Sequence, residues 1–544
     1  MFVETQTIAA LGPEILLIIA ATAIFIGGAF SPSRAWWTIV ALVSYVAAAG
    51  ILATYGSPWT AGTLLTGPLA IDPTSLAFRW LALLVGICFT LIASKLANTR
   101  LASEFLGTLM MLVVGVMIVS SANELVLLFL GLELISVPTY VLLFLGRRDA
   151  ASAEATMKYF FLSILASALM LYGMSFLYGL GETTLITSGS MEFKGIRETL
   201  LATSAADEKP AILALLPLAL VLILAGLGFK LAAAPFQFYA PDVYQGTTNA
   251  NAGLLAVAPK VAGIIGLVRL VLIAMPIAAE FAWQLALVLA IVTMTIGNVC
   301  ALWQKDFRRL MAYSSIAHTG YLLIGLAAAA ASIALPESKS SGGIAAMLFY
   351  VIVYAVASMG TFAAVAYLGS EKKEVRSVDE LAGLYKSQPI VAGVIAVFMF
   401  SLAGIPPLAG FWGKLTLFSS AIEFAAGDAG IAASRWFTLL AIAGALNAAI
   451  AAAYYLRVIS VMFFQPQTTA PAAAGGSGAL LASLLCAAIV LFSGTLPGGL
   501  VSLSGAAEKQ IAKPDYVPIV SPIQAEKSTP ATPATEAAPQ TAAR

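Results

Sequence analysis

The sequence predicts an all-α polytopic membrane protein with about fourteen transmembrane helices. The chain has 544 residues, of which 60% are hydrophobic and only 10% charged, and its mean hydropathy is +0.95. Soluble domains carry about 25% charged residues. Apolar stretches of about 20 residues, long enough to cross a bilayer, recur along the whole length. Two of these stretches also contain proline and glycine breaks beside a lysine.

The apolar stretches follow one another with short polar connections, of which 181–210 is the longest. The first has no basic segment before it, so we interpret it as a span and not as a cleaved signal peptide. The expected spans are 8–30, 36–55, 76–97, 105–121, 125–145, 158–180, 211–239, 250–275, 281–303, 308–330, 343–369, 390–420, 436–464 and 478–500.

Lysine and arginine in the short connections predict the orientation, because cytoplasmic loops carry more of them. Odd-numbered connections hold Arg34, Lys95, Arg100, Arg147, Arg148, Lys305, Arg308, Arg309, Lys372, Lys373, Arg376 and Lys386. Even-numbered connections hold Arg79, Lys194, Arg197, Lys209, Lys339 and Arg435. This bias places the odd connections in the cytoplasm and both termini outside it.

Spans seven and twelve are expected to be broken. Pro235 follows Lys230 in the first, and Pro406 and Pro407 precede Lys414 in the second. Proline in mid-span removes a backbone donor and clashes with the preceding turn. A broken helix at membrane depth persists only inside protein or beside water. Because an odd offset of five spans inverts a segment, spans 4–8 and 9–13 are expected to form two inverted five-helix repeats.

This organisation divides the chain into five parts. The first three spans occupy 1–100, the first repeat 101–275, and the second repeat 276–465. The last span lies in 466–504. The remainder, 505–544, is rich in proline, alanine and threonine and is expected to be a disordered tail, because it cannot bury a core.

Four ionisable residues lie within apolar stretches: Glu133, Lys230, Lys260 and Lys414. A charge at the centre of a lipid-embedded helix costs about 2.5–3.5 kcal/mol, and such residues mark ion or proton paths. We expect Glu133 to pair with Lys230, whose proton affinity would then depend on its neighbour's charge. The alternatives are a protonated, hydrogen-bonded glutamate and lysines that snorkel to an interface. Snorkelling is a stronger alternative for Lys260, which is nearer a span start.

Four further residues are open between a relay role and a structural one. Glu154 and Lys158 have the spacing of a surface i,i+4 pair, which is their structural alternative. His318, the only histidine, titrates near neutrality and has hydroxyl residues around it, but a hydrogen-bonded core histidine is the competing interpretation. Glu124 stands at the start of the fifth span.

Several function classes find no support in the sequence. Cys88, Cys300 and Cys486 are scattered singly, without the spacing of a metal or iron–sulfur site. No P-loop, haem motif or dinucleotide fingerprint is present. The net charge of +1 does not indicate nucleic-acid binding. We therefore expect no cofactor or metal in this chain.

Five runs of sequence resemble subunit N of NADH-quinone oxidoreductase, or respiratory complex I. They are Ser121 to Glu133, Ser152 to Phe160, Pro241 to Gly246, Arg309 to His318, and Ser401 to Lys414. The resemblance extends from the first helix to about the fourteenth and excludes the tail. That subunit belongs to a family of antiporter-like membrane subunits related to Mrp-type cation/proton antiporters.

The resemblance implies a half-channel in each repeat, joined by a central polar axis. Glu133 takes the family's charge-switching glutamate, Lys230 the lysine of the first broken helix, Lys260 the central lysine, and Lys414 the lysine of the second broken helix, toward the exit side. Lys158 and His318 also match. One position departs: Gln237 stands where the family often has histidine. Glutamine hydrogen-bonds water but does not titrate.

The function that the resemblance implies is proton translocation in a bacterial inner membrane, without redox chemistry in this chain. NADH, FMN, iron–sulfur clusters and quinone would be handled by other subunits of the complex. Neighbouring antiporter-like subunits and membrane lipids would be its partners. The alternatives are a subunit of a Mrp-type antiporter or ion-linked hydrogenase complex, which would exchange cations without NADH, and a structural spacer, whose lysine mutants would misassemble.

Overall fold

A computed structural model describes most of the chain. The described residues are 2–59, 62–96, 101–147, 149–188, 194–205, 211–335, 342–370, 373–427, 430–467, 471 and 473–512. The expected tail from residue 513 onward lies outside them. So do five residues used for the orientation: Arg100, Arg148, Lys209, Lys339 and Lys372.

The described residues contain thirteen helices long and apolar enough to cross a membrane. Eleven of them each contain one continuous α-helix: α2 (Gly12–Phe30), α3 (Arg34–Ala53), α4 (Pro73–Leu96), α5 (Ala102–Ser121), α6 (Leu125–Gly146), α7 (Ala150–Gly181), α12 (Ala279–Leu302), α13 (Phe307–Ala334), α14 (Gly343–Leu368), α18 (Ile431–Phe464) and α19 (Ser477–Thr495). Another consists of α11 (Asn249–Leu267) and the π-helical turn η4 (Val268–Ala274). The last is the broken seventh span. The short helices α16 (Pro389–Ala403) and α17 (Ala409–Ala425) together form the expected twelfth span, which confirms the polytopic all-α fold.

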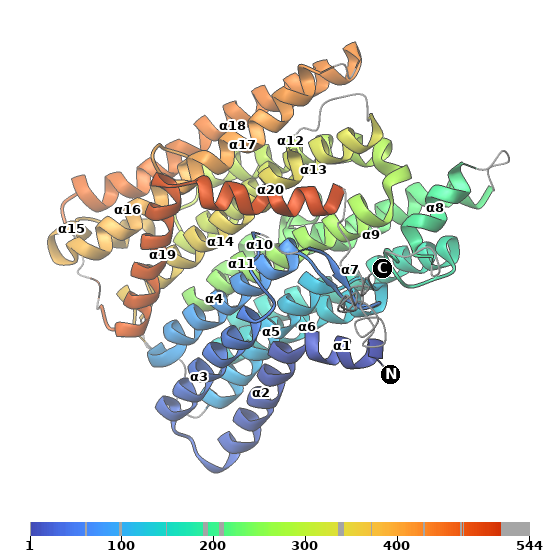
Figure 1. The fold of residues 1–544 in the computed structure, drawn as a ribbon. Coiled ribbons are helices and arrows are strands. Elements are labelled where there is room, and N and C mark those ends of the chain that lie inside the picture. Colours follow the sequence, from blue (N-terminus) through green and yellow to red (C-terminus); the bar gives the residue numbers. More distant parts are fainter. Residues whose placement is uncertain are drawn as a thin grey trace, which may run out of the picture.

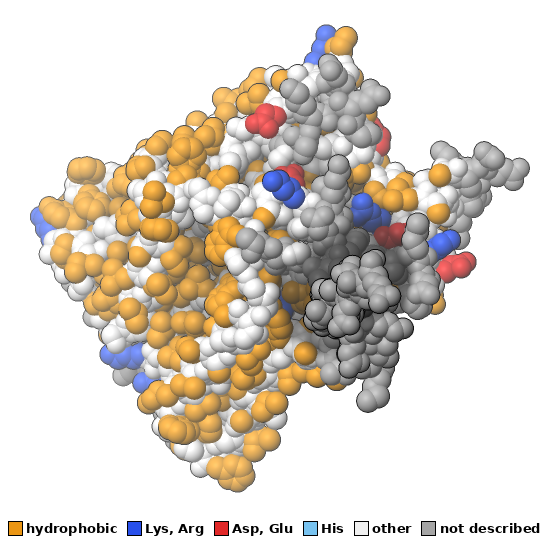
Figure 2. Space-filling model, viewed as in Figure 1, with side chains coloured by type: hydrophobic (Ala, Val, Ile, Leu, Met, Phe, Trp, Pro, Cys, Tyr) orange, Lys and Arg blue, Asp and Glu red, His pale blue; other side chains and the backbone are white. Residues whose placement is uncertain are grey.

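The spanning helices form one bundle with a buried centre (Figure 1). The spans of α11, α13 and α14 are 89–100% buried, whereas those of α2, α3 and α18 are 28–33% buried. The exposed surface is nevertheless largely apolar: Figure 2 shows hydrophobic side chains over most of the visible face and few charged ones. Such a surface suits lipid and neighbouring membrane subunits. The centre of the bundle is therefore where polar groups are shielded from lipid.

The first break lies between α9 (Leu216–Leu231) and the pair η3 (Phe236–Tyr239) and α10 (Ala240–Gly246). Ala232 ends α9 with a positive φ of 54°. The backbone amides of Ala232 and Ala233 donate to the carbonyls of Phe229 and Gly228, and the Tyr239 hydroxyl also donates to Phe229. The helix end is thus satisfied inside the protein, as a break at membrane depth requires.

The second break has the same local design. Gly404 ends α16 with a φ of 90°, and its amide donates to the carbonyl of Phe400. Pro407 follows Gly404 by three residues, as Pro235 follows Ala232. The two lysines nevertheless lie on opposite sides of their breaks, since Lys230 precedes the first and Lys414 follows the second.

Three features outside the spans were not predicted from the sequence. A two-stranded hairpin, β1 (Leu64–Leu65) and β2 (Ala70–Ile71), joins spans two and three, and a short helix, α8 (Ile196–Ser204), lies in the long 181–210 connection. The tail boundary at Gly505 was wrong, because α20 (Gly498–Ala512) continues past it. Leu503, Ala507 and Ile511 are buried at i, i+4 and i+8, and α20 contacts α14 and α4 with this apolar side.

The remaining short elements lie at the ends of spans. They are α1 (Phe2–Ala10), η2 (Ala211–Leu215), η5 (Pro276–Ala278), η6 (Val378–Leu381) and α15 (Leu384–Ser387).

Candidate functional site

The three lysines lie at the centre of the bundle, and none reaches its surface. Lys230 is at the end of α9, Lys260 in α11 and Lys414 in α17, with relative exposures of 4%, 1% and 4%. The snorkelling alternative is therefore wrong for all three. Buried amines of this kind need hydrogen-bond acceptors, and each of them has some.

Lys230 and Glu133 form the expected pair. The Lys230 Nζ lies 3.7 Å from Glu133 Oε1 on α6, and it donates to Ser136 Oγ at 2.6 Å and to the carbonyl of Leu132 at 3.3 Å. The Ser167 hydroxyl of α7 donates to the glutamate. The Glu133 side chain is 27% exposed and that of Lys230 only 3%. The pair therefore runs from the edge of the bundle to its interior.

Lys260 is joined to the first break by one hydroxyl group. Its Nζ donates to Thr319 Oγ1 at 2.6 Å and to the carbonyl of Ser315, both on α13. The Thr319 hydroxyl donates in turn to the carbonyl of Leu231 at 2.6 Å, next to Lys230. The ammonium also lies 5.4 Å from the centre of the Tyr354 ring. The Thr319 hydroxyl thus connects Lys260 with the backbone next to Lys230.

His318 lies on the same helix as these hydroxyls and is almost fully buried, with 2% exposure. Its Nδ1 lies 2.5 Å from the Tyr350 hydroxyl and its Nε2 2.9 Å from that of Tyr455. Hydroxyls donate and accept, so both tautomers are accommodated. The ring centres of His318 and Tyr321 lie 5.9 Å apart, and Tyr321 in turn faces Lys414. His318 therefore occupies the region between the central lysine and the second break.

Lys414 lies against the end of α16. Its Nζ donates to the carbonyl of Ala403 at 2.9 Å and lies 5.0 Å from the centre of the Tyr321 ring. A β-carbon on Gly404 would be 2.9 Å from Lys414 Cδ, which is closer than such contacts occur. Gly404 thus provides both the positive φ and the space for the amine.

Among the described residues, neither Lys260 nor Lys414 forms an ion pair with a carboxylate. Carbonyls, hydroxyls and aromatic faces surround them instead. Only Lys230 has a carboxylate partner, at 3.7 Å. We call the line of buried groups from Glu133 and Lys230 through Lys260 to Lys414 the buried axis. It runs from one ion pair to two amines without carboxylate partners, so a charge at one group affects the next.

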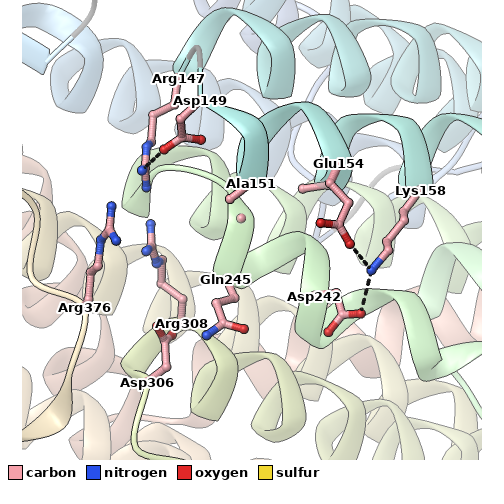
Figure 3. A pocket seen from close by; sticks show the side chains of 12 residues that line it. Arg147, Asp149, Ala151, Glu154, Lys158, Asp242, Gln245, Asp306, Arg308 and Arg376 are labelled. Carbon is pink, nitrogen blue, oxygen red and sulfur yellow. Dashed lines mark hydrogen bonds and ion pairs between the residues drawn. The ribbon is translucent and has the colours of Figure 1, made fainter.

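Glu154, Lys158 and Glu124 lie outside this buried axis. Lys158 bonds Glu154 at 2.6 Å and Asp242 at 3.0 Å, and its side chain is 41% exposed. Figure 3 shows this triad at one end of a cavity of about 430 Å³. Glu124 precedes α6 at the opposite end from Arg147, and it accepts from Thr184 Oγ1 at 2.9 Å. The structure therefore does not bring these three together with the buried lysines.

The cavity is connected to the axis by α10. Asp242 lines the cavity, whereas Tyr244, two residues later, is buried. The Tyr244 hydroxyl lies 3.3 Å from Ser315 Oγ, which also accepts from Tyr354 at 2.9 Å. Sequence reasoning missed both Asp242 and Tyr244. The signal was present in an acidic residue just after Pro241, the proline that follows Pro235 in the broken span.

Buried ion pairs elsewhere hold the bundle together. Arg79 of α4 bonds Glu14 of α2 through Nε at 2.8 Å and Nη2 at 2.5 Å, and both side chains are fully buried. Arg269 of η4 lies 3.2 Å from Asp72. Glu14 and Arg269 thus have structural roles in these buried pairs. Arg79 is a poor orientation signal, because its charge is neutralised within the bundle.

Comparisons with known proteins agree with the geometry. A family profile described as "NADH:quinone oxidoreductase/Mrp antiporter, TM" matches residues 122–453. The "NADH-quinone oxidoreductase subunit N" of Trichlorobacter lovleyi is 33% identical over 516 residues, covering 93% of this chain and 98% of the relative. The protein of that name from Anaeromyxobacter sp. is 38% identical over 440 residues, covering 78% and 81%.

Solved structures show the same architecture. A chain of respiratory complex I from Thermus thermophilus superposes with a TM-score of 0.72 at 29% identity, covering 90% of this chain and 98% of that one. A chain of the Mrp complex from Dietzia sp. has a TM-score of 0.73 at 19% identity, covering 94% and 98%, which shows the fold alone. The resemblance expected from the five sequence runs is confirmed. The chain belongs to the NADH-quinone oxidoreductase subunit N family of antiporter-like membrane proteins.

Proposed function

We propose that this protein is the proton-translocating, non-redox subunit N of an NADH-quinone oxidoreductase in a bacterial inner membrane. Electrons would pass from NADH through FMN and iron–sulfur clusters to quinone in other subunits. One observation carries the proposal: buried amines, hydroxyls and an imidazole follow one another from Glu133 to Lys414 through the centre of the bundle.

The first step is electrostatic. Glu133 is the partly exposed member of its ion pair, so a charge change in a neighbouring subunit reaches it first. Two unit charges about 4 Å apart interact by about 4 kcal/mol in an environment of intermediate polarity. Weakening the Glu133–Lys230 attraction by even a third of that would change the proton affinity of Lys230 about tenfold.

The proton then moves along the axis. From Lys230 it passes by Thr319 to Lys260, and from there by the His318 region toward Lys414. Each arrival places a positive charge near the next amine, so repulsion between like charges favours onward transfer. Release follows on the outer side, next to the second break.

Uptake is proposed from the charged cavity. Arg147, Asp306 and Arg376, which line it, belong to odd-numbered connections, and the lysine and arginine bias assigns these to the cytoplasm. Tyr244 and Ser315 connect the cavity with Lys260. Both chain termini would then face outside the cytoplasm.

The inverted repeats 101–275 and 276–465 belong to this proposal. Their support is the equal spacing at the two breaks, where a residue of positive φ is followed three residues later by proline. Inverted repeats with discontinuous helices at a central site are a recurrent design of membrane transporters.

Purification through a tag on this chain tests the assignment. The tagged complex would be isolated in mild detergent, its chains identified, and its inhibitor-sensitive NADH:quinone activity measured. Flavin and iron–sulfur subunits with NADH oxidation are expected. Isolation with only antiporter-like membrane chains, and cation exchange without NADH, would instead assign the protein to a Mrp-type antiporter or a related complex.

A further inference from the structure

Three guanidinium groups converge at one end of the cavity, away from Lys158. They belong to Arg147 at the end of α6, Arg308 in the first turn of α13, and Arg376 just before η6. Figure 3 shows their side chains turned toward one another across the cavity. We call them the three-arginine cluster. Segments far apart in the sequence thus bring three like charges together.

Two of the three guanidinium groups form ion pairs. Arg147 bonds Asp149, and Arg308 lies 3.2 Å from Glu374. The Arg376 side chain forms no ion pair within the described part of the chain. Arg376 is therefore the guanidinium group of the cluster that has no carboxylate partner among the described residues.

The other carboxylates of the cavity are already engaged. Glu154 and Asp242 bond Lys158, and Asp242 also bonds Arg309 at 2.7 Å. Asp306 caps α13 by accepting from the Arg309 amide at 2.9 Å. None of these carboxylates forms an ion pair with Arg376.

A buried donor in the cluster also lacks a partner. Arg308 is 1% exposed, and its Nε has no hydrogen-bond acceptor among the described residues. Its Nη1 is engaged with the carbonyl of Thr247 and with Glu374. An unpaired donor on a buried guanidinium calls for a specific explanation, because such groups are nearly always satisfied.

We propose that the three-arginine cluster binds a phosphate group, presented by an anionic lipid headgroup or by a soluble phosphate. Guanidinium groups match phosphate oxygens in paired hydrogen bonds. The cavity, about 430 Å³, is in the size range of small-molecule sites. Basic pockets between membrane helices at the cytoplasmic side bind anionic headgroups.

A bound phosphate would hold together three loops of the bundle: the one after α6, the one before α13 and the one before η6. It would share the cavity with Asp242, where the proposed uptake path begins, but at the opposite end. The site stands on its own charges and hydrogen bonds, so it does not depend on the proposed proton path.

Binding measurements on the delipidated complex test this site. Labelled inorganic phosphate and labelled phosphatidylglycerol in mixed micelles would each be titrated, with phosphatidylcholine as the zwitterionic comparison. Arg376→Gln and Arg147→Gln/Arg376→Gln are the variants, because Arg376 is exposed and Arg147 is partly exposed. The matched control is Arg435→Gln, an exposed arginine on α18.

We expect the double variant to lose one equivalent of bound phosphate compound, and Arg376→Gln to raise the dissociation constant at least about tenfold. Arg435→Gln should bind as the unmodified complex does. Saturation by inorganic phosphate would identify a soluble ligand, and saturation by phosphatidylglycerol alone a lipid. Equal binding by all variants, or no saturable binding of either probe, would overturn the proposal.

Discussion

Gly404→Ala should displace Lys414 while leaving the rest of the bundle in place. Gly404 has a φ of 90°, and a β-carbon there would lie 2.9 Å from Lys414 Cδ. A residue with a β-carbon pays roughly 1–2 kcal/mol for a left-handed conformation. The overlap is with a flexible side chain, so we expect the lysine to move and not the helix.

Displacement would break the bond from Lys414 Nζ to the carbonyl of Ala403, which measures 2.9 Å. Hydrogen bonds of charged groups contribute about 1.5–3 kcal/mol. Together with the backbone strain, the total effect is roughly 2.5–5 kcal/mol, most of it localised at the second break. A change of this size at one buried group should stop proton transfer to Lys414.

The assay is the number of protons pumped per electron by the purified complex in sealed proteoliposomes, with assembly checked by native electrophoresis. Gly393→Ala is the matched control, because Gly393 lies in the same helix and a β-carbon there meets nothing within 4 Å. We expect normal pumping from the control and a lower ratio from Gly404→Ala. An unchanged ratio in the assembled Gly404→Ala complex would refute the role assigned to the position of Lys414.

Three further outcomes are expected. Glu133→Ala and Lys230→Ala should each assemble but pump fewer protons per electron, and normal pumping by both would contradict a role for the pair. Tyr244→Phe removes the hydroxyl 3.3 Å from Ser315 Oγ and should slow uptake several-fold in time-resolved pumping. Burial raises the pKa of Asp149, but the Ser152 amide and the adjacent guanidinium outweigh it, so its pKa lies below its usual value. Its stabilisation is therefore present above pH 4, roughly the unfolded pKa, and is lost as the pH falls toward the folded pKa. In thermal unfolding at pH 7, Asp149→Ala should be about 1 kcal/mol less stable than the unmodified protein. The unmodified protein should lose this stabilisation on acidification. Asp149→Asn keeps a hydrogen-bond acceptor and should not lose stability in this way.

The sequence predicted the spans and the breaks because both follow from local chemistry. Apolar length identifies a membrane helix, and proline in mid-span interrupts one wherever it occurs. Glu133 and Lys230 could be paired from their cost in lipid alone, and the structure places them 3.7 Å apart. The snorkelling alternative for Lys260 could not be rejected from the sequence, because the burial of this lysine depends on the helices packed around it.

Other features depend on contacts between distant segments. The composition of the C-terminal part hid the short apolar stripe that holds α20 on α14, because three buried residues among small and polar ones barely change an average. Tyr244 is one of many tyrosines until α13 is placed beside α10. Arg79 resembled a loop charge because its partner, Glu14, lies 65 residues away.

The most direct test of the account is proton pumping by the complex carrying Lys260→Met. Lys260 is the central amine and is 1% exposed, so neither a surface effect nor a lost ion pair complicates its removal. Lys386→Met, at an exposed lysine of α15, is the matched control. The account predicts an assembled complex that pumps fewer protons per electron than the control. An assembled Lys260→Met complex that pumps the same number as the control would contradict a proton path through the centre of this subunit.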